Sequence, residues 1–165
     1  MPITFPEVKT DEDVALTAGL AKEIWTEHYT PIIGAAQVEY MLANIQSEAA
    51  IRQQIDHERF LYFLLEQNGE PVGYIGVQLG ETELFLSKIY VRGSERRKGL
   101  GGEAVRFVTE LARKRGMEKI SLTVNKHNTA AIRSYEKLGF ENLGSTVKDI
   151  GGGFVMDDYR MELAL

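Results

Sequence analysis

One segment near the middle of the chain combines cations and glycines in a pattern suited to phosphate. Residues 89–102 read IYVRGSERRKGLGG, an apolar strand followed by cations, glycines and the start of a predicted helix. A helix start offers N–H groups without intrahelical acceptors and the positive end of the helix dipole. Glycines allow close backbone approach, and neighbouring cations attract a diphosphate. The pattern indicates a phosphate site, although a tight turn before a helix would explain the glycine spacing alone equally well.

Two other phosphate-binding loops do not fit this segment. A P-loop requires Lys-Ser or Lys-Thr directly after its glycines, and no such pair is present. The dinucleotide pattern G-x-G-x-x-G is not met by Gly99, Gly101 and Gly102. A nucleoside triphosphate or a dinucleotide is therefore disfavoured as the ligand.

A second segment completes a family resemblance. Residues 96–101, RRKGLG, are similar to the R/Q-x-x-G-x-G/A signature of the GNAT acyltransferases, and residues 128–140, NTAAIRSYEKLGF, are similar to their N-x-x-A-x-x-x-Y-x-x-x-G-F segment. The resemblance is sharpest from Leu84 to Phe140 and extends in element order over almost the whole chain. It implies a single N-acetyltransferase domain over residues 1–165, with acetyl-coenzyme A as the co-substrate and no metal.

The resemblance also implies where coenzyme A binds. In this superfamily two central parallel strands splay apart, and the pantetheine arm lies along the exposed strand edge. The implied binding residues lie on the strand, in the loop that follows it, and on the segment that begins at Asn128. They are Ile89, Tyr90, Val91, Arg96, Arg97, Lys98, Gly99, Leu100, Gly101, Gly102, Asn128 and Tyr135.

Acetyl transfer to an amine needs partners for two developing charges, an oxyanion and a departing thiolate. The N–H of Ile89 is the expected oxyanion partner, and the hydroxyl of Tyr135 is the expected general acid. Without the surrounding motif, Tyr135 would instead be interpreted as a core aromatic on a helical stripe.

The general base and the acceptor site carry weaker signals. Glu83 is the first candidate base, and Ser87, on the same strand face under period-two alternation, is expected to hold a water; Glu83 as a solvated acid at the strand end remains the alternative. The N-terminal helices are expected to line the acceptor site through Trp25, His28, Tyr29 and Tyr40, for which core packing is the alternative. Asp157 and Asp158 are placed to attract a cationic amine, or to face solvent.

These residues are positioned by a predicted α/β fold, a mixed and mostly antiparallel sheet of about seven strands with a central parallel pair and helices on both faces. Hydrophobic periodicity predicts helices at 11–29, 37–44, 47–57, 100–115 and after Asn128, with Pro31 ending the first. It predicts strands at 3–8, 60–67, 72–79, 83–91, 119–124, 141–150 and 154–163. Gly151, Gly152 and Gly153 are expected to form a turn with unusual backbone angles.

Composition narrows the class of protein. The formal charge of −5 argues against a nucleic-acid partner, no apolar run is long enough for a membrane helix, and the absence of cysteine excludes disulfides and a cysteine nucleophile. Without a secretory signal we expect a cytoplasmic protein, and a homodimer is possible. The predicted reaction is acetylation of a primary amine on a small molecule such as a polyamine or amino-sugar. The alternatives are a protein N-terminal or lysine acetyltransferase, a non-catalytic acyl-coenzyme A sensor, and a plain structural domain without a coenzyme A site.

Overall fold

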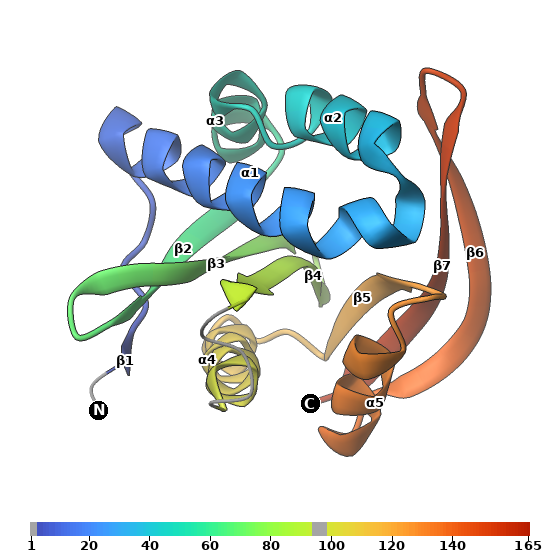
Figure 1. Ribbon diagram of the computed structural model, residues 1–165. Coiled ribbons are helices and arrows are strands. Elements are labelled where there is room, and N and C mark those ends of the chain that lie inside the picture. The colour runs from blue at the N-terminus through green and yellow to red at the C-terminus, as the bar shows by residue number, and fades with distance from the viewer. Residues whose placement is uncertain (1–2, 94–98) are drawn as a thin grey trace.

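A computed structural model describes residues 3–93 and 99–165, and its centre is one seven-stranded sheet (Figure 1). The strand order is β1-β2-β3-β4-β5-β7-β6. The strands are β1 (Ile3–Thr4), β2 (Phe60–Gln67), β3 (Glu70–Leu79), β4 (Glu83–Val91), β5 (Lys119–Asn125), β6 (Glu141–Gly151) and β7 (Phe154–Ala164). The helices are α1 (Asp11–Ile33), α2 (Ala35–Asn44), α3 (Glu48–His57), α4 (Leu100–Lys114) and α5 (Thr129–Lys137).

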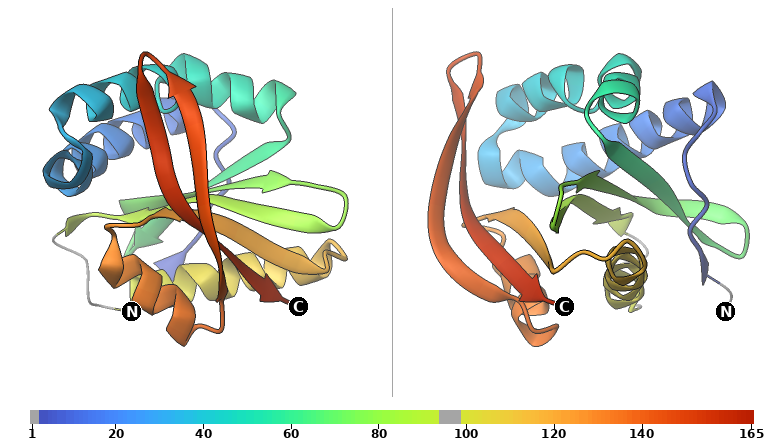
Figure 2. Two further views of the ribbon diagram at one scale, coloured as in Figure 1. Left: turned by 90° about the vertical axis from the view of Figure 1, so that its right-hand side faces the viewer. Right: turned by 180° about the vertical axis from the view of Figure 1, so that it is seen from behind.

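The layers match the predicted fold class. Every neighbouring strand pair is antiparallel except β4 with β5, which is parallel. Figures 1 and 2 show α1, α2 and α3 on one face of the sheet, with α4 and α5 on the other. The predicted mixed sheet with a central parallel pair and helices on both faces is confirmed.

Two apolar clusters fill the space between these layers. One joins α4 to the sheet, because Leu100, Ala104, Val108 and Ala112 recur at helical spacing and are all buried there. The other joins α1, α2 and α3 to the opposite face, and Tyr62 and Tyr74 are fully buried within it. The sheet is therefore packed on both faces, which holds the edges of its central strands in fixed positions.

The first helix begins as predicted and ends later than predicted. Thr10 and Asp13 form a reciprocal capping box that fixes its start. Pro31 lies inside the helix, which continues to Ile33 and ends at Gly34. A proline close to the end removes only one backbone hydrogen bond, and Gly34 N–H still reaches the Thr30 carbonyl at 3.0 Å. The prediction that Pro31 breaks the helix, with its last residue at 29, was wrong by four residues.

Strand β4 contains a bulge at its midpoint. Val77 of β3 pairs with Leu86, and Gly76 pairs with Lys88, so Ser87 is an extra residue without a partner in this ladder. A bulge of one residue moves the side chains that follow it to the other face of the sheet.

The bulge changes which β4 residues share a face. Leu86 packs into the cluster beneath α4, whereas Lys88 lies over the rings of Phe60 and Tyr62 on the α1 side. Simple alternation would place Lys88 on the same face as Leu86, and the bulge breaks that relation.

The parallel pairing of β4 with β5 is short. It covers Glu83, Leu84 and Phe85 against Lys119, Ile120 and Ser121. Beyond these residues β5 continues along β7 only, as in the pairing of Val124 with Tyr159. The two central strands therefore diverge at their C-terminal ends, as the family resemblance implies.

No helix in the described ranges 3–93 and 99–165 is both long enough and apolar enough to cross a membrane.

Candidate active site

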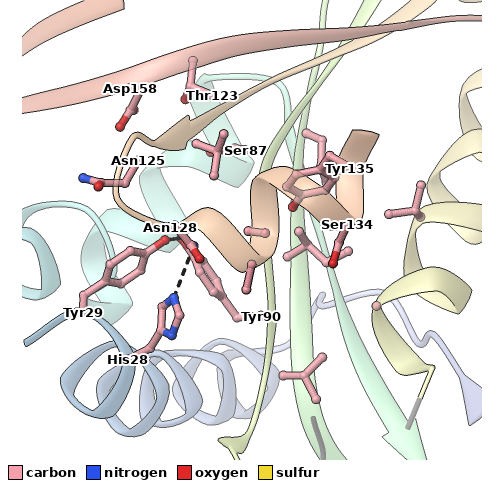
Figure 3. A pocket seen from close by; sticks show the side chains of 18 of the residues that line it. His28, Tyr29, Ser87, Tyr90, Thr123, Asn125, Asn128, Ser134, Tyr135 and Asp158 are labelled. Atoms are coloured by element: carbon pink, nitrogen blue, oxygen red, sulfur yellow. Dashed lines mark hydrogen bonds between the residues drawn. The ribbon is translucent and has the colours of Figure 1, made fainter. Parts of the chain in front are cut away.

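A cavity of about 600 Å³ occupies the gap where β4 and β5 diverge (Figure 3). One wall is the C-terminal half of β4, and the facing wall is formed by β5 and α5. The start of α4 closes one end, while α1, α2 and β7 bound the other. Of the residues predicted for the site, the cavity is lined by His28, Tyr29, Ser87, Ile89, Tyr90, Val91, Gly99, Leu100, Gly101, Gly102, Asn128, Tyr135 and Asp158.

The edge of β4 presents unused backbone groups to this cavity. Arg92 N–H donates to the Val72 carbonyl at 2.8 Å, so the backbone N–H of Arg92 faces β3. Backbone direction alternates along an antiparallel strand, which turns the N–H and carbonyl groups of Ile89 and Val91 away from β3. Since the ladder with β5 ends at Phe85, these groups are available to an extended ligand.

At the α4 end of the cavity, main-chain groups of glycine residues face the cavity. Gly99 is the N-cap with φ 77°, a left-handed conformation that favours glycine, and Glu103 N–H donates back to its carbonyl at 3.2 Å. Leu100, Gly101 and Gly102 form the first turn, where N–H groups have no intrahelical acceptor. A Cβ added to Gly101 or Gly102 would meet no atom of residues 3–93 or 99–165 within 4 Å. The predicted binding residues Arg96, Arg97 and Lys98 lie outside the described residues.

Tyr135 lies on α5, facing the cavity from the β5 side (Figure 3). Its ring packs edge to face on Phe140, with centroids 5.5 Å apart, which accounts for their fixed spacing in the sequence. Burial, assisted by the nearby Tyr29, raises the pKa of the Tyr135 hydroxyl above its usual range. The hydroxyl therefore keeps its proton at neutral pH.

Asn128 connects α5 to α1 across the cavity. It is the N-cap residue of α5 as predicted, but its side chain makes no capping hydrogen bond. Its Nδ2 instead lies 3.2 Å from His28 Nε2, the contact drawn in Figure 3. Tyr29, one position further along α1, shares a 3.0 Å hydrogen bond with the Tyr90 hydroxyl. These two links hold α1 against the cavity walls.

Two of the residues predicted to line the acceptor site do not reach it. Trp25 is 2% exposed and packs edge to face against Tyr29 and Tyr90 as part of the α1 core. Tyr40 contacts the turn between β6 and β7, where its hydroxyl donates to the Ile150 carbonyl at 3.1 Å and its ring packs on Phe154. Both residues contribute to packing, which was the alternative interpretation for each.

Tyr40 also explains why the β6–β7 turn is rich in glycine. Gly151, Gly152 and Gly153 all have positive φ, as predicted. A Cβ on Gly152 would lie 2.6 Å from the Tyr40 ring, so α2 and the turn pack too closely for a side chain. Gln37 Nε2 adds a 2.8 Å hydrogen bond to the Val155 carbonyl. Together these contacts, which we call the α2–turn clasp, bound the cavity at its α2 and β7 end.

Glu83, the first candidate for the general base, is not brought to the cavity. It lies in the short paired region of β4 and β5, where its carboxylate accepts hydrogen bonds from Ser121 and, at 3.1 Å, from Arg160. Lys119 Nζ is 3.5 Å away. Burial tends to raise the pKa of Glu83, but these hydrogen bonds and positive charges outweigh it and hold the pKa below its usual range. A carboxylate with three partners is a structural ion-pair centre and a poor proton acceptor.

The two acidic residues of β7 have different surroundings. Asp157 forms a 2.7 Å salt bridge with Lys126 and does not line the cavity. Asp158 is 6% exposed, lines the cavity and lies beside Thr123 (Figure 3). Strand alternation puts neighbouring residues on opposite faces, and Asp158 is the one that faces inward.

Sequence reasoning missed other lining residues and a buried lysine. Leu86, Thr123, Asn125 and Ser134 also line the cavity and carried no motif signal. Lys88 is 6% exposed and donates to Ser87 Oγ at 2.6 Å, and burial lowers its pKa to about 7. Among residues 3–93 and 99–165, no cluster of three or more His, Cys, Asp or Glu side chains is arranged to hold a metal ion.

The sequence of this chain is similar to those of known proteins. The model of the acetyltransferase (GNAT) family matches residues 20–140. Ribosomal protein bS18-alanine N-acetyltransferase of Escherichia coli K12 is 37% identical over 83 residues, covering 50% of this chain and 56% of the relative. N-acetyltransferase family 8 member 3 of Mus musculus is 24% identical over 133 residues, covering 77% of this chain and 54% of the relative. The chain thus matches about half the length of each of these two relatives.

Solved structures share the fold over the whole chain. The PaiA N-acetyltransferase of Thermoplasma acidophilum, solved in complex with coenzyme A, superimposes with a TM-score of 0.81 at 20% identity, covering 100% of both chains. The ribosomal-protein-S18-alanine N-acetyltransferase of Escherichia coli gives 0.74 at 24% identity, covering 99% of this chain and 94% of that one. Because the family model spans most of the sequence and the splayed strands match the motifs that predicted them, the chain belongs to the acetyltransferase (GNAT) family.

Proposed function

We propose that this protein is an N-acetyltransferase that moves the acetyl group of acetyl-coenzyme A to the primary amine of a small molecule, by direct attack in a ternary complex. The observation that carries this proposal is the continuous cavity between the diverging strands β4 and β5. It joins an exposed strand edge, a glycine-lined helix start and a protonated tyrosine in one space.

The described residues fit an acyl-coenzyme A in chemical type and in order. The N–H and carbonyl groups of Ile89 and Val91 suit an extended pantetheine arm, which carries amide groups able to pair with a strand edge. The first-turn amides at Gly101 and Gly102 suit the diphosphate, and the open space beside both glycines leaves room for it. Bound there, the molecule supplies an activated acetyl thioester.

The chain's own groups serve the two charges that the reaction creates. The amine nitrogen forms a bond to the acetyl carbon, and the carbon–sulfur bond then breaks. The N–H of Ile89 stabilises the oxyanion that develops between these steps. Tyr135 donates its phenolic proton to the departing sulfur, since its raised pKa keeps the proton in place until the thiolate forms.

The shape of the cavity at the end bounded by α1, α2 and β7 supports a small acceptor. The α2–turn clasp joins the two elements that bound this end, through the Tyr40 and Gln37 hydrogen bonds. Such a boundary favours a compact amine over an extended polypeptide. The second candidate acceptor is a protein N-terminal amine, which is favoured by the 37% identity to an enzyme named for alanine acetylation of ribosomal protein bS18.

The direct test is a panel of amines assayed for release of free coenzyme A, with acetyl-coenzyme A as donor. The panel should contain aliphatic and aromatic monoamines, a polyamine, an aminoglycoside and a peptide with an N-terminal alanine. Turnover with a small amine, with a kcat/KM at least tenfold above that of the peptide, supports the proposal. Turnover with the peptide alone favours the second candidate, and binding without turnover of any amine indicates a sensor.

A further inference from the structure

The acceptor end of the cavity contains a buried carboxylate, that of Asp158. Asp158 projects from β7 beside Thr123, and Figure 3 shows both at the end of the view opposite Tyr135, with Ser87 between. Among residues 3–93 and 99–165, no lysine or arginine lines this cavity. Asp158 forms no salt bridge within those ranges, unlike its neighbour Asp157.

A carboxylate in such a place needs a compensating partner. Removing an ionised carboxylate from water costs several kcal/mol unless a counter-charge or hydrogen bonds replace the water. The Thr123 side chain lies beside Asp158, which is only 6% exposed. Its strand partners are neutral, Asn125 on β5 and Thr146 on β6. A cation that enters from the cavity would supply the compensating charge.

We propose that Asp158 binds the ammonium group of the acceptor and then accepts its proton, as the general base of the reaction. This inference rests on the proposed acetyl transfer. The carboxylate oxygen takes one proton from the ammonium, and the nitrogen lone pair released by that step forms the bond to the acetyl carbon. Tyr135 supplies a proton to the sulfur as the carbon–sulfur bond breaks, and the nitrogen releases its second proton to solvent, which leaves the neutral amide. Solvent then removes the proton from Asp158 and reprotonates Tyr135, so each turnover of an ammonium releases one net proton.

The walls around Asp158 indicate the class of amine. Ile33 of α1, Met41 of α2 and Met156 of β7 line the same end of the cavity and present apolar surface. The adaptable methionine side chains fit irregular apolar shapes. Since one carboxylate serves this end, the second ammonium of a polyamine would be desolvated without a partner. The preferred acceptor is thus a monoamine on an apolar body, aliphatic or aromatic.

The electrostatics of Asp158 suit a base that works near neutral pH. Burial and the charge of Asp157 raise its pKa to about 6, against smaller opposing effects of the Thr123 hydrogen bond and the charge of Lys126. The carboxylate is the active form, so kcat/KM for the amine should fall as the pH drops through about 6. One pH unit below that value the loss is about tenfold.

The test compares the substitutions Asp158→Asn, Asp158→Glu and Asp157→Asn. D158N keeps the shape of the side chain and removes the charge and the base, whereas D157N removes the neighbouring carboxylate outside the cavity. We expect D158N to lower kcat/KM for a monoamine by about 100-fold or more and to abolish the acid limb near pH 6. D157N should stay within threefold of the wild type, and D158E should retain the acid limb at reduced rate.

The binding of acetyl-coenzyme A, measured by calorimetry, separates this inference from the proposed function. D158N should bind it within twofold of the wild type, because the carboxylate lies at the other end of the cavity. If D158N retains kcat/KM within threefold together with its acid limb, the role of Asp158 is refuted while the enzyme assignment stands. If the wild type binds acetyl-coenzyme A but acetylates no amine, the proposed function fails and the base assignment fails with it. A polyamine preferred over every monoamine refutes the substrate class alone.

Discussion

Replacing Tyr135 with Phe removes one hydroxyl from the cavity and leaves the aromatic ring in place. The ring's packing on Phe140 does not involve the hydroxyl, and no hydrogen bond to this hydroxyl occurs within the described ranges of the chain. We therefore expect Y135F to fold normally, with a melting temperature within about 2 °C of the wild type. The affinity for acetyl-coenzyme A should stay within threefold.

The expected loss in rate follows from the chemistry of the leaving group. General acid catalysis contributes about 10² to 10⁴ in rate, which is about 2.7 to 5.5 kcal/mol. A thiol pKa near 8.5 makes the thiolate a moderately good leaving group, so the lower end of that range applies. We expect kcat to fall about 100-fold in Y135F. Because burial keeps the Tyr135 pKa above its usual range, the wild type should show no alkaline limb from this residue.

The assay is coenzyme A release at saturating amine, with cofactor affinity measured in parallel. Tyr159→Phe is the matched control, since Tyr159 lies on β7, where it pairs with Val124 of β5, and does not line the cavity. Its kcat should stay within twofold of the wild type. A Y135F enzyme that retains kcat within threefold refutes the general-acid role. A loss of affinity equal to the loss of kcat/KM, with kcat unchanged, assigns Tyr135 to binding.

Two further substitutions test the electrostatic assignments. Glu83→Gln should leave kcat within threefold of the wild type. It should lower the free energy of unfolding by about 1 kcal/mol in urea titrations, because it weakens partly exposed contacts with Arg160 and Lys119. A loss of kcat above 50-fold would instead indicate that Glu83 is the base. Lys88→Met should raise the melting temperature by several degrees at pH 7. The pKa of Lys88 in the folded protein, about 7, lies below its value in the unfolded chain, so the wild type gains stability as the pH rises from 7 to 10. The variant should lack that gain. An identical dependence of melting temperature on pH in both proteins contradicts this assignment.

Local pattern predicted most of the elements because each strand and helix carries its own period. Strands β2 and β4 have the predicted bounds, and α4 begins at Leu100 as its apolar stripe indicates. The first strand was predicted to span 3–8 and is only Ile3–Thr4, although Val8 N–H still bonds the Tyr62 carbonyl at 2.8 Å. Pro6 has no N–H to donate, which interrupts a regular ladder there.

The errors in the site come from contacts between distant segments. The bulge at Ser87 depends on the pairing of β4 with β3, and it turns Lys88 to the face opposite Leu86 in a way that period-two alternation does not reveal. Tyr40 is drawn to a turn more than 100 residues away, where three glycines leave space for its ring. Asp157 and Asp158 are adjacent in the sequence, and only the sheet determines which of them faces the cavity. The motif residues Gly99, Leu100, Gly101, Asn128 and Tyr135 all line the cavity, because the spacing of each motif encodes a local unit. Their binding and catalytic roles stay predictions.

The central claim is that a thioester donor lies along the edge of β4 in the gap beside β5. Residue-resolved amide hydrogen exchange, measured by NMR with and without acetyl-coenzyme A, tests it most directly. The N–H groups of Ile89 and Val91 face the gap, whereas the N–H of Tyr90 faces β3 and is an internal control. We predict that saturating donor slows exchange at Ile89 and Val91 by at least tenfold and leaves Tyr90 within twofold. Unchanged exchange at Ile89 and Val91, with or without binding elsewhere on the protein, would contradict the account.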